Sequence, residues 1–216
     1  MVYKSKPKNP TATRRKLLEA AIALMRRQGF SATTVERICA EAGVTKGAFF
    51  HHFQSKEDIG ESAVLQWCES RADGYQTHLG EVGDDPLEKL DRLLQGLAES
   101  ARNPPDDLLV CLLGMVSQEL GATHERMRRT CAAALEGWTG FVAHLLGAAK
   151  KIHPVRVEFD PEHVGWLFNS LWQGSLLVAK TRRDPEIVVR NLEHARAYVA
   201  TLFAPDSTSG SATKKN

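Results

Sequence analysis

The stretch from Ser31 to Lys56 constrains the fold more than any other part of the chain. Thr33 or Thr34 can cap a helix, and Glu36 stands three residues after Thr33, which is the spacing of a capping box. Apolar residues then recur at i, i+3, i+4 and i+7 from Val35 to Ala42. This periodicity predicts a short amphipathic helix whose apolar stripe must be buried.

A second short helix is predicted directly after the first. Gly43 suits the left-handed conformation that reverses the chain past a helix end, and Thr45 can cap a new helix that continues to His52. Phe49 and Phe53 share one side of that helix. The pair is predicted to be a helix-turn-helix, whose second helix would present to DNA the outward residues Lys46, Gly47, Phe50 and His51.

Any small helical protein can contain two amphipathic helices separated by glycine. The residue identities in this stretch are more specific than that helical pattern. The residues that carry the resemblance are Gly29-Phe30, Thr33-Thr34-Val35, Ile38, Ala42-Gly43-Val44-Thr45-Lys46-Gly47, Phe49-Phe50-His51-His52-Phe53 and Ser55-Lys56-Glu57-Asp58. From about Thr11 to Leu65 the chain resembles the DNA-binding domain of the TetR family of transcriptional repressors. The resemblance implies an all-α homodimer whose larger C-terminal domain binds a small molecule and thereby releases a palindromic operator.

The resemblance also implies roles for single residues. Thr34 and Thr45 would bind phosphates at helix N-termini, whereas His52 and Lys56 would hold the DNA backbone. The family usually has tyrosine at the position of Phe50, so this chain lacks a phosphate-binding hydroxyl there and would contact a thymine methyl group instead. The complete set of predicted DNA-binding residues is Thr33, Thr34, Thr45, Lys46, Gly47, Phe50, His51, His52 and Lys56.

Charge is distributed unevenly along the chain, whose formal net charge is +2. Residues 1–56 contain eleven Lys or Arg and three Asp or Glu, which gives +8, and the remaining residues carry −6. A basic N-terminal segment is what a polyanion partner requires, although a solvated charge run would have the same composition.

The four cysteines are widely spaced and form no C-x-x-C pair, so neither a zinc site nor a disulfide framework is indicated and a reducing cytoplasm is expected. No export signal is visible, and the uncharged run from His163 to Ala179 is short for a bilayer span. We expect no membrane partner, no metal and no cofactor.

Turn and capping signals divide the chain into about nine helices with no strand pattern. We expect a flexible basic arm at 1–10, the helix-turn-helix domain at 11–54, a ligand-binding and dimerisation domain at 55–204, and a disordered tail at 205–216. Three Asp-Pro pairs mark helix starts at Asp85, Asp160 and Asp184, and another helix is expected from about Asp106 to Leu120.

The last two predicted helices carry wide apolar faces beside small residues such as Gly174. Two such helices from each of two subunits would form a four-helix interface, although core packing within one subunit would produce the same pattern. A dimer also fits a palindromic site, which needs two reading heads roughly 34 Å apart. The predicted interface residues are Val164, Leu171, Ser175, Val188, Leu192 and Val199.

The middle helices are expected to enclose the effector pocket, lined by Cys111, Met115, Trp138, Phe141, Phe168 and Trp172, although aromatic residues at helical spacing are more often core. The runs Cys111-Leu112-Leu113-Gly114 and Trp172-Gln173-Gly174, with Lys180, resemble a TetR branch that includes electrophile-responsive repressors. This resemblance implies redox or electrophile sensing through Cys111, with Lys180 stabilising its thiolate if the two are adjacent. The alternative is an inert cysteine packed in the core.

Enzyme classes find little support in the sequence. His51-His52 lie in a basic stretch, and His124-Glu125 lacks the second histidine of the H-E-x-x-H zinc pattern. We therefore predict a protein that is not an enzyme. A helical adaptor that docks on a protein through the same two helices remains an alternative, which the +8 charge disfavours.

Overall fold

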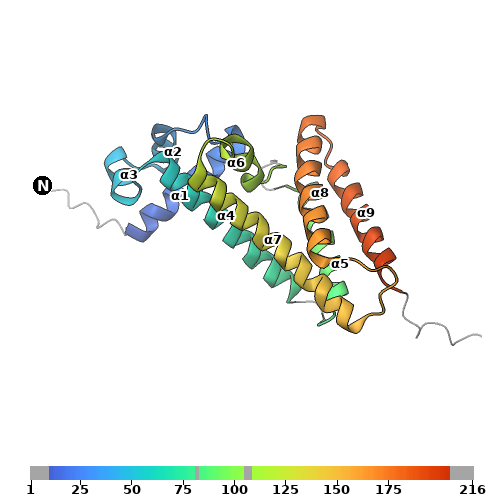
Figure 1. Cartoon of the computed structure of the whole chain (residues 1–216). Coiled ribbons are helices and arrows are strands. Elements are labelled where there is room, and N and C mark those ends of the chain that lie inside the picture. Colours follow the sequence, from blue (N-terminus) through green and yellow to red (C-terminus); the bar gives the residue numbers. More distant parts are fainter. Residues whose placement is uncertain (1–9, 81–82, 105–108, 205–216) are drawn as a thin grey trace, which may run out of the picture. The chain divides into compact units, whose positions relative to one another are not determined.

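The computed structural model describes residues 10–80, 83–104 and 109–204, and over these residues it is built from helices (Figure 1). The described ranges contain nine α-helices, and their only extended pairing is an isolated bridge between Val155 and Phe203. The all-α prediction is thereby confirmed. The helices are α1 (Pro10–Gln28), α2 (Val35–Ala42), α3 (Lys46–His52), α4 (Lys56–Leu79), α5 (Pro86–Arg102), α6 (Leu112–Leu120), α7 (Glu125–Ile152), α8 (Pro161–Arg182) and α9 (Glu186–Leu202).

Aspartate caps followed by proline begin two of these helices, as predicted. The Asp85 carboxylate accepts the Leu87 N–H at 2.8 Å at the start of α5, and the Asp160 carboxylate accepts the Glu162 N–H at 2.8 Å at the start of α8. Proline takes the first helical position of both helices, where its missing N–H costs nothing. The third pair differs by one residue, because α9 begins after Pro185 rather than at it.

The predicted start of α6 is wrong. Asp106 lies outside the described residues, Leu109 to Cys111 are not helical, and α6 begins only at Leu112. Cys111 precedes it with an extended backbone, φ −100° and ψ 116°.

Backbone packing divides the chain into two compact units. The first comprises the residues up to Asp73 together with Val110–Ala134, and the second comprises Gly74–Leu109 together with the residues from Leu135 onward. Helix α6 therefore packs in the same unit as α1, α2 and α3, although the sequence assigned it to the C-terminal domain. The predicted arm, apart from residue 10, and the predicted tail fall outside the described residues.

The second unit is held together by apolar faces of α5, α8 and α9 and by polar links between the helices. Asp91 of α5 accepts a hydrogen bond from the Arg196 guanidinium of α9 at 3.1 Å. The buried Asn169 of α8 donates to the Leu135 carbonyl at 3.1 Å and to the Thr139 hydroxyl at 3.0 Å. None of the described helices is both long and apolar enough to cross a membrane.

Candidate nucleic-acid interface

Helices α1, α2 and α3 close around one small apolar core. Leu17 and Met25 of α1, Ile38 of α2, and Phe49 with Phe53 at α3 are almost fully removed from solvent. The Phe49 and Phe53 rings lie 5.8 Å apart, and both are on the side of α3 that the sequence predicts to be buried. The opposite side of α3 is therefore left for a partner.

The turn between α2 and α3 depends on a left-handed glycine. Gly43 has φ 64°, and its N–H donates to the Ala40 carbonyl at 3.2 Å while the Val44 N–H donates to the Cys39 carbonyl at 3.0 Å. A Cβ atom at Gly43 would meet no atom within 4 Å. Backbone conformation rather than space therefore explains why glycine suits this position.

Threonine hydroxyls cap both helices of the pair, but only one of the two adjacent candidates caps α2. Thr34 accepts the Arg37 N–H at 3.3 Å, and Thr45 accepts the Ala48 N–H at 3.2 Å. Thr33 is fully buried, and its hydroxyl donates to the Gly29 carbonyl at 2.7 Å. Thr33 therefore faces the core and is not available to DNA, contrary to the prediction.

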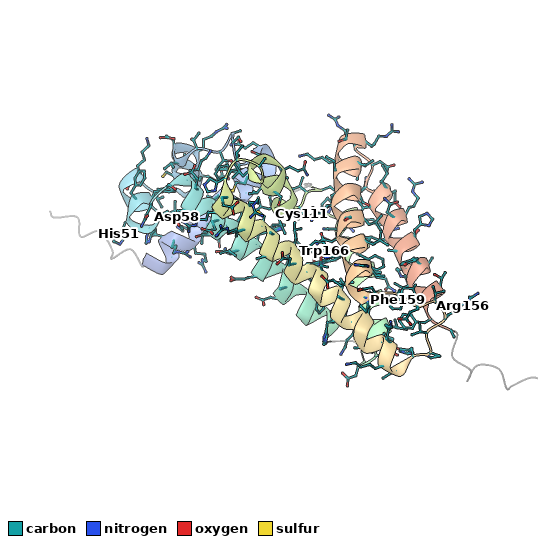
Figure 2. All side chains as sticks on the ribbon, in the orientation of Figure 1. His51, Asp58, Cys111, Arg156, Phe159 and Trp166 are labelled. Atoms are coloured by element: carbon teal, nitrogen blue, oxygen red, sulfur yellow. The ribbon has the colours of Figure 1, made fainter. Side chains whose placement is uncertain are left out.

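The outward face of α3 carries the other candidates. Lys46 and Gly47 are exposed, Phe50 has 57% of its surface exposed, and His52 is half-buried. His51 is also exposed (Figure 2). Gly47 keeps this surface low, because it has no side chain to hold a ligand away from the backbone. The face combines a cation, an aromatic edge and imidazole groups, which are suited to phosphates and base edges.

Lys46 forms an ion pair with Glu36 of α2, the residue predicted to complete a capping box. Because Thr34 rather than Thr33 is the cap, Glu36 does not stand at capping-box spacing and is available to Lys46. The hydrogen bond from Lys46, its own backbone N–H and the Thr34 hydroxyl lower the pKa of Glu36 to about 2. The pair holds the Lys46 ammonium beside the start of α3.

Lys56 lies elsewhere than predicted. Its ammonium donates to the Phe30 carbonyl at 3.1 Å and to the Ser31 carbonyl at 3.4 Å, and it sits 4.3 Å from the centre of the Phe30 ring. It therefore stabilises the turn before α2 instead of projecting toward a phosphate. The prediction missed this because the two partners lie 25 and 26 residues away in sequence.

Two protein-family models match the helix-turn-helix and most of the rest of the chain. The model described as "Bacterial regulatory proteins, tetR family" matches residues 17–63, and "Tetracyclin repressor-like, C-terminal domain" matches residues 86–195, which is more than half of the chain. The chain belongs to the TetR family. It is therefore a DNA-binding transcriptional regulator, and the helix-turn-helix is the DNA-binding element of this TetR-family protein.

Similar proteins match most of the length of the chain. The transcriptional regulator AcuR of Cereibacter sphaeroides is 28% identical over 79% of this chain and 77% of its own. The transcriptional repressor NemR of Escherichia coli is 26% identical over 88% of this chain and 94% of its own. A TetR transcriptional regulator from Chloroflexus aurantiacus, 21% identical, has the same fold with a TM-score of 0.81 over 91% of this chain and 98% of that one. These relatives are regulators rather than enzymes.

The predicted effector residues of this TetR-family protein are divided between the two units. Cys111 and Met115 belong to the first unit, whereas Trp138, Phe141, Phe168 and Trp172 belong to the second. Phe168 is buried and packs edge-on against Tyr198 with ring centres 6.4 Å apart, so it belongs to the core between α8 and α9. Lys180, the suggested cation partner of Cys111, lies in the second unit.

All four thiols belong to the first unit. Burial, with smaller contributions from Cys111 and Cys131, raises the pKa of Cys68 to about 11, and burial also raises the pKa of Cys131. Cys39 is buried as well. Cys111, directly before the first residue of α6, is half-buried (Figure 2).

The predicted dimer residues mostly pack α8 and α9 within one chain. Val164, Ser175, Val188 and Leu192 are buried, and the Ser175 hydroxyl accepts a hydrogen bond from Asn191 at 2.9 Å, while Leu171 and Val199 are half-buried. The buried four are thus not available to a second subunit. The exposed large apolar side chains of these two helices are instead Trp166, Leu167, Leu177, Val178 and Tyr198.

Proposed function

We propose that this TetR-family protein represses transcription by binding a palindromic operator as a homodimer, and that a small molecule releases it. The observation that supports the proposal most is α3, whose one side is sealed by Phe49 while Thr45, Lys46 and Gly47 are exposed at its start. A helix of this kind fits the major groove with its N-terminal residues against base edges. Acting on bacterial DNA, the protein would work in the cytoplasm, and we assign it no catalytic activity.

The dimer interface is proposed for the exposed stripe of α8. Trp166 and Leu177 are eleven residues apart, as are Leu167 and Val178, so each pair lies on one line along the helix. Gly174 is exposed between them, and a Cβ atom there would meet nothing within 4 Å of its own subunit. A large apolar stripe interrupted by a small residue is suited to close packing against the same helix of a second copy.

Lys46→Ala tests whether α3 reads bases. We expect a loss of about 1–3 kcal/mol in operator binding and a weaker preference at one base pair, because a lysine that contacts guanine contributes to specificity as well as affinity.

Lys16→Ala is the matched control, since it removes the same charge from the exposed side of α1. It should weaken binding to all sequences alike, as phosphate contacts do. Titration of operator and mismatched duplexes with both variants measures the difference. Equal, sequence-independent losses for both would show that Lys46 binds only phosphate.

We also propose that the effector is an electrophile or oxidant that acts on Cys111. One similar structure is that of Escherichia coli NemR in its reduced form. Among the described cysteines, Cys39 and Cys131 are buried, and Cys68 has a raised pKa, which leaves Cys111 as the thiol suited to reaction.

Treatment with N-ethylmaleimide tests this second proposal. The Cys111 thiolate should add across the maleimide double bond first, as mass spectrometry of peptides would show, and operator affinity should fall by about tenfold, within the usual range of coupling between sites. Cys111→Ser provides the control and should keep its affinity after treatment. If operator affinity falls equally in that variant, or does not fall in the protein that keeps Cys111, Cys111 is not the site of action.

A further inference from the structure

The turn between α1 and α2 is bound to α6 through one carboxylate. Glu119, near the end of α6, accepts the Phe30 N–H at 2.9 Å and the Ser31 N–H at 2.7 Å, one with each oxygen. These partners are 89 and 88 residues apart in sequence, yet all three belong to the first compact unit. Charge-assisted hydrogen bonds of this kind are stronger than those between neutral groups.

A cation holds the same turn from its carbonyl side. Lys56 of α4 donates to the carbonyls of Phe30 and Ser31, whose N–H groups bind Glu119. Partial burial works to raise the pKa of Glu119, but the N–H groups of Ser31 and Phe30 and the charge of Lys56 lower it below its ordinary value. The turn therefore lies between two opposite charges, and each is directed at the backbone groups it can bind.

Packing leaves the turn little freedom to move without α6. Gly29 has φ +85°, and a Cβ atom there would lie 2.5 Å from Glu119 Oε1. The Phe30 ring is buried, and it approaches Gly60 of α4 so closely that a Cβ at Gly60 would lie 2.6 Å from Phe30 Cε2. The Thr33 hydroxyl binds the Gly29 carbonyl on the α2 side. Displacement of α6 must therefore pull this turn or break its hydrogen bonds.

We infer that Glu119 is a positioning residue for DNA binding, because its carboxylate fixes the Gly29–Ser31 turn to α6 and thereby sets how α1 leads into α2. The inference rests on the proposed role of α3 in reading DNA. Glu119 touches no DNA and acts through the orientation of the helix-turn-helix. Since α6 begins at Leu112 and ends at Leu120, Glu119 links a movement of this helix to the turn.

Glu119→Gln in the full-length protein tests the inference, because the amide keeps the shape but accepts with only one oxygen. Amide hydrogen exchange should be about tenfold faster at Phe30 and Ser31 and unchanged at Phe49 and Phe53. Affinity for an operator selected with the unmodified protein should fall about tenfold, within the range of charged hydrogen bonds, while affinity for random duplexes of the same length stays constant.

Gln118→Ala, an exposed neighbour on α6, is the control and should change neither the exchange rates nor the operator affinity.

Three results would overturn the inference. Unchanged exchange at Phe30 and Ser31 would show that the contact does not hold the turn. Faster exchange there with unchanged operator affinity would show that the turn does not position α3. Equal losses for operator and random DNA, with a lower thermal midpoint and faster exchange throughout α1 to α3, would show a purely structural role. If the unmodified protein does not distinguish operator from random DNA, the proposed function itself fails, whereas the exchange rates still report separately on the contact.

Discussion

Replacing Leu177 by aspartate is expected to convert the dimer into a monomer and to weaken operator binding by at least about a hundredfold. Leu177 has 53% of its surface exposed on α8, beside Val178 and on the same line as Trp166. If this stripe meets a second copy, the new carboxylate becomes buried there without a partner, which costs several kcal/mol. In a dimer, binding of one subunit to its half-site raises the effective concentration of the second subunit at the other half-site. Separate monomers lose this gain, which is a factor of about 10² to 10⁴ in affinity.

Leu65→Asp is the matched control for this prediction. Leu65 has 47% of its surface exposed on α4, so the substitution adds the same charge at an exposed apolar position outside α8 and α9. Sedimentation or light scattering gives the subunit number of both variants, and titration of a palindromic duplex gives their affinity. A Leu177→Asp protein that remains dimeric, or a Leu65→Asp protein that dissociates, would place the interface elsewhere.

Phe49→Ala is expected to unfold the three-helix unit of α1, α2 and α3, with a loss of about 3–5 kcal/mol in the free energy of unfolding. The Phe49 ring is fully buried and lies 5.8 Å from Phe53, so its removal leaves a cavity at the centre of the three-helix core. DNA binding should be lost together with the amide protection of α1 to α3. Denaturant unfolding followed by circular dichroism, with hydrogen exchange to locate the change, measures the effect.

Phe50→Ala is the natural comparison, because it removes the same side chain one residue later. Phe50 is 57% exposed, so its truncation should change the free energy of unfolding by no more than about 0.5 kcal/mol. It should instead reduce the preference for thymine at one operator position, if the ring contacts a thymine methyl group. Equal destabilisation by both variants would show that the two faces of α3 have been assigned wrongly.

Local signals predicted most helix boundaries because the groups that end a helix lie within a few residues of it. Asp85 and Asp160 bind N–H groups two residues ahead, so the sequence contains both partners. The start of α6 was not predictable in this way, since Cys111, the residue directly before Leu112, forms no capping hydrogen bond through its side chain. Between Thr33 and Thr34, two adjacent capping residues, sequence alone could not decide which hydroxyl would turn inward.

The outward face of α3 was predictable from the sequence, whereas the residues that hold the turn between α1 and α2 in place were not. Helical periodicity puts Phe49 and Phe53 together, and the rest of a seven-residue helix must then face outward. Glu119 and Lys56 act on a turn that is distant in sequence, so no spacing reveals them. Four of the six predicted dimer residues are buried within their own subunit, because α8 has apolar residues on several sides and the pattern does not say which side that subunit covers.

Selection of bound fragments from random DNA, followed by titration at two salt concentrations, tests the central claim most directly. The account predicts a palindromic site with half-sites roughly 34 Å apart and a steep fall in affinity as salt rises, because phosphate contacts release counterions. Failure of the folded, dimeric protein to enrich any sequence, or binding that salt leaves unchanged, would contradict it. That result would favour the alternative of a helical adaptor that uses the same two helices to dock on a protein partner.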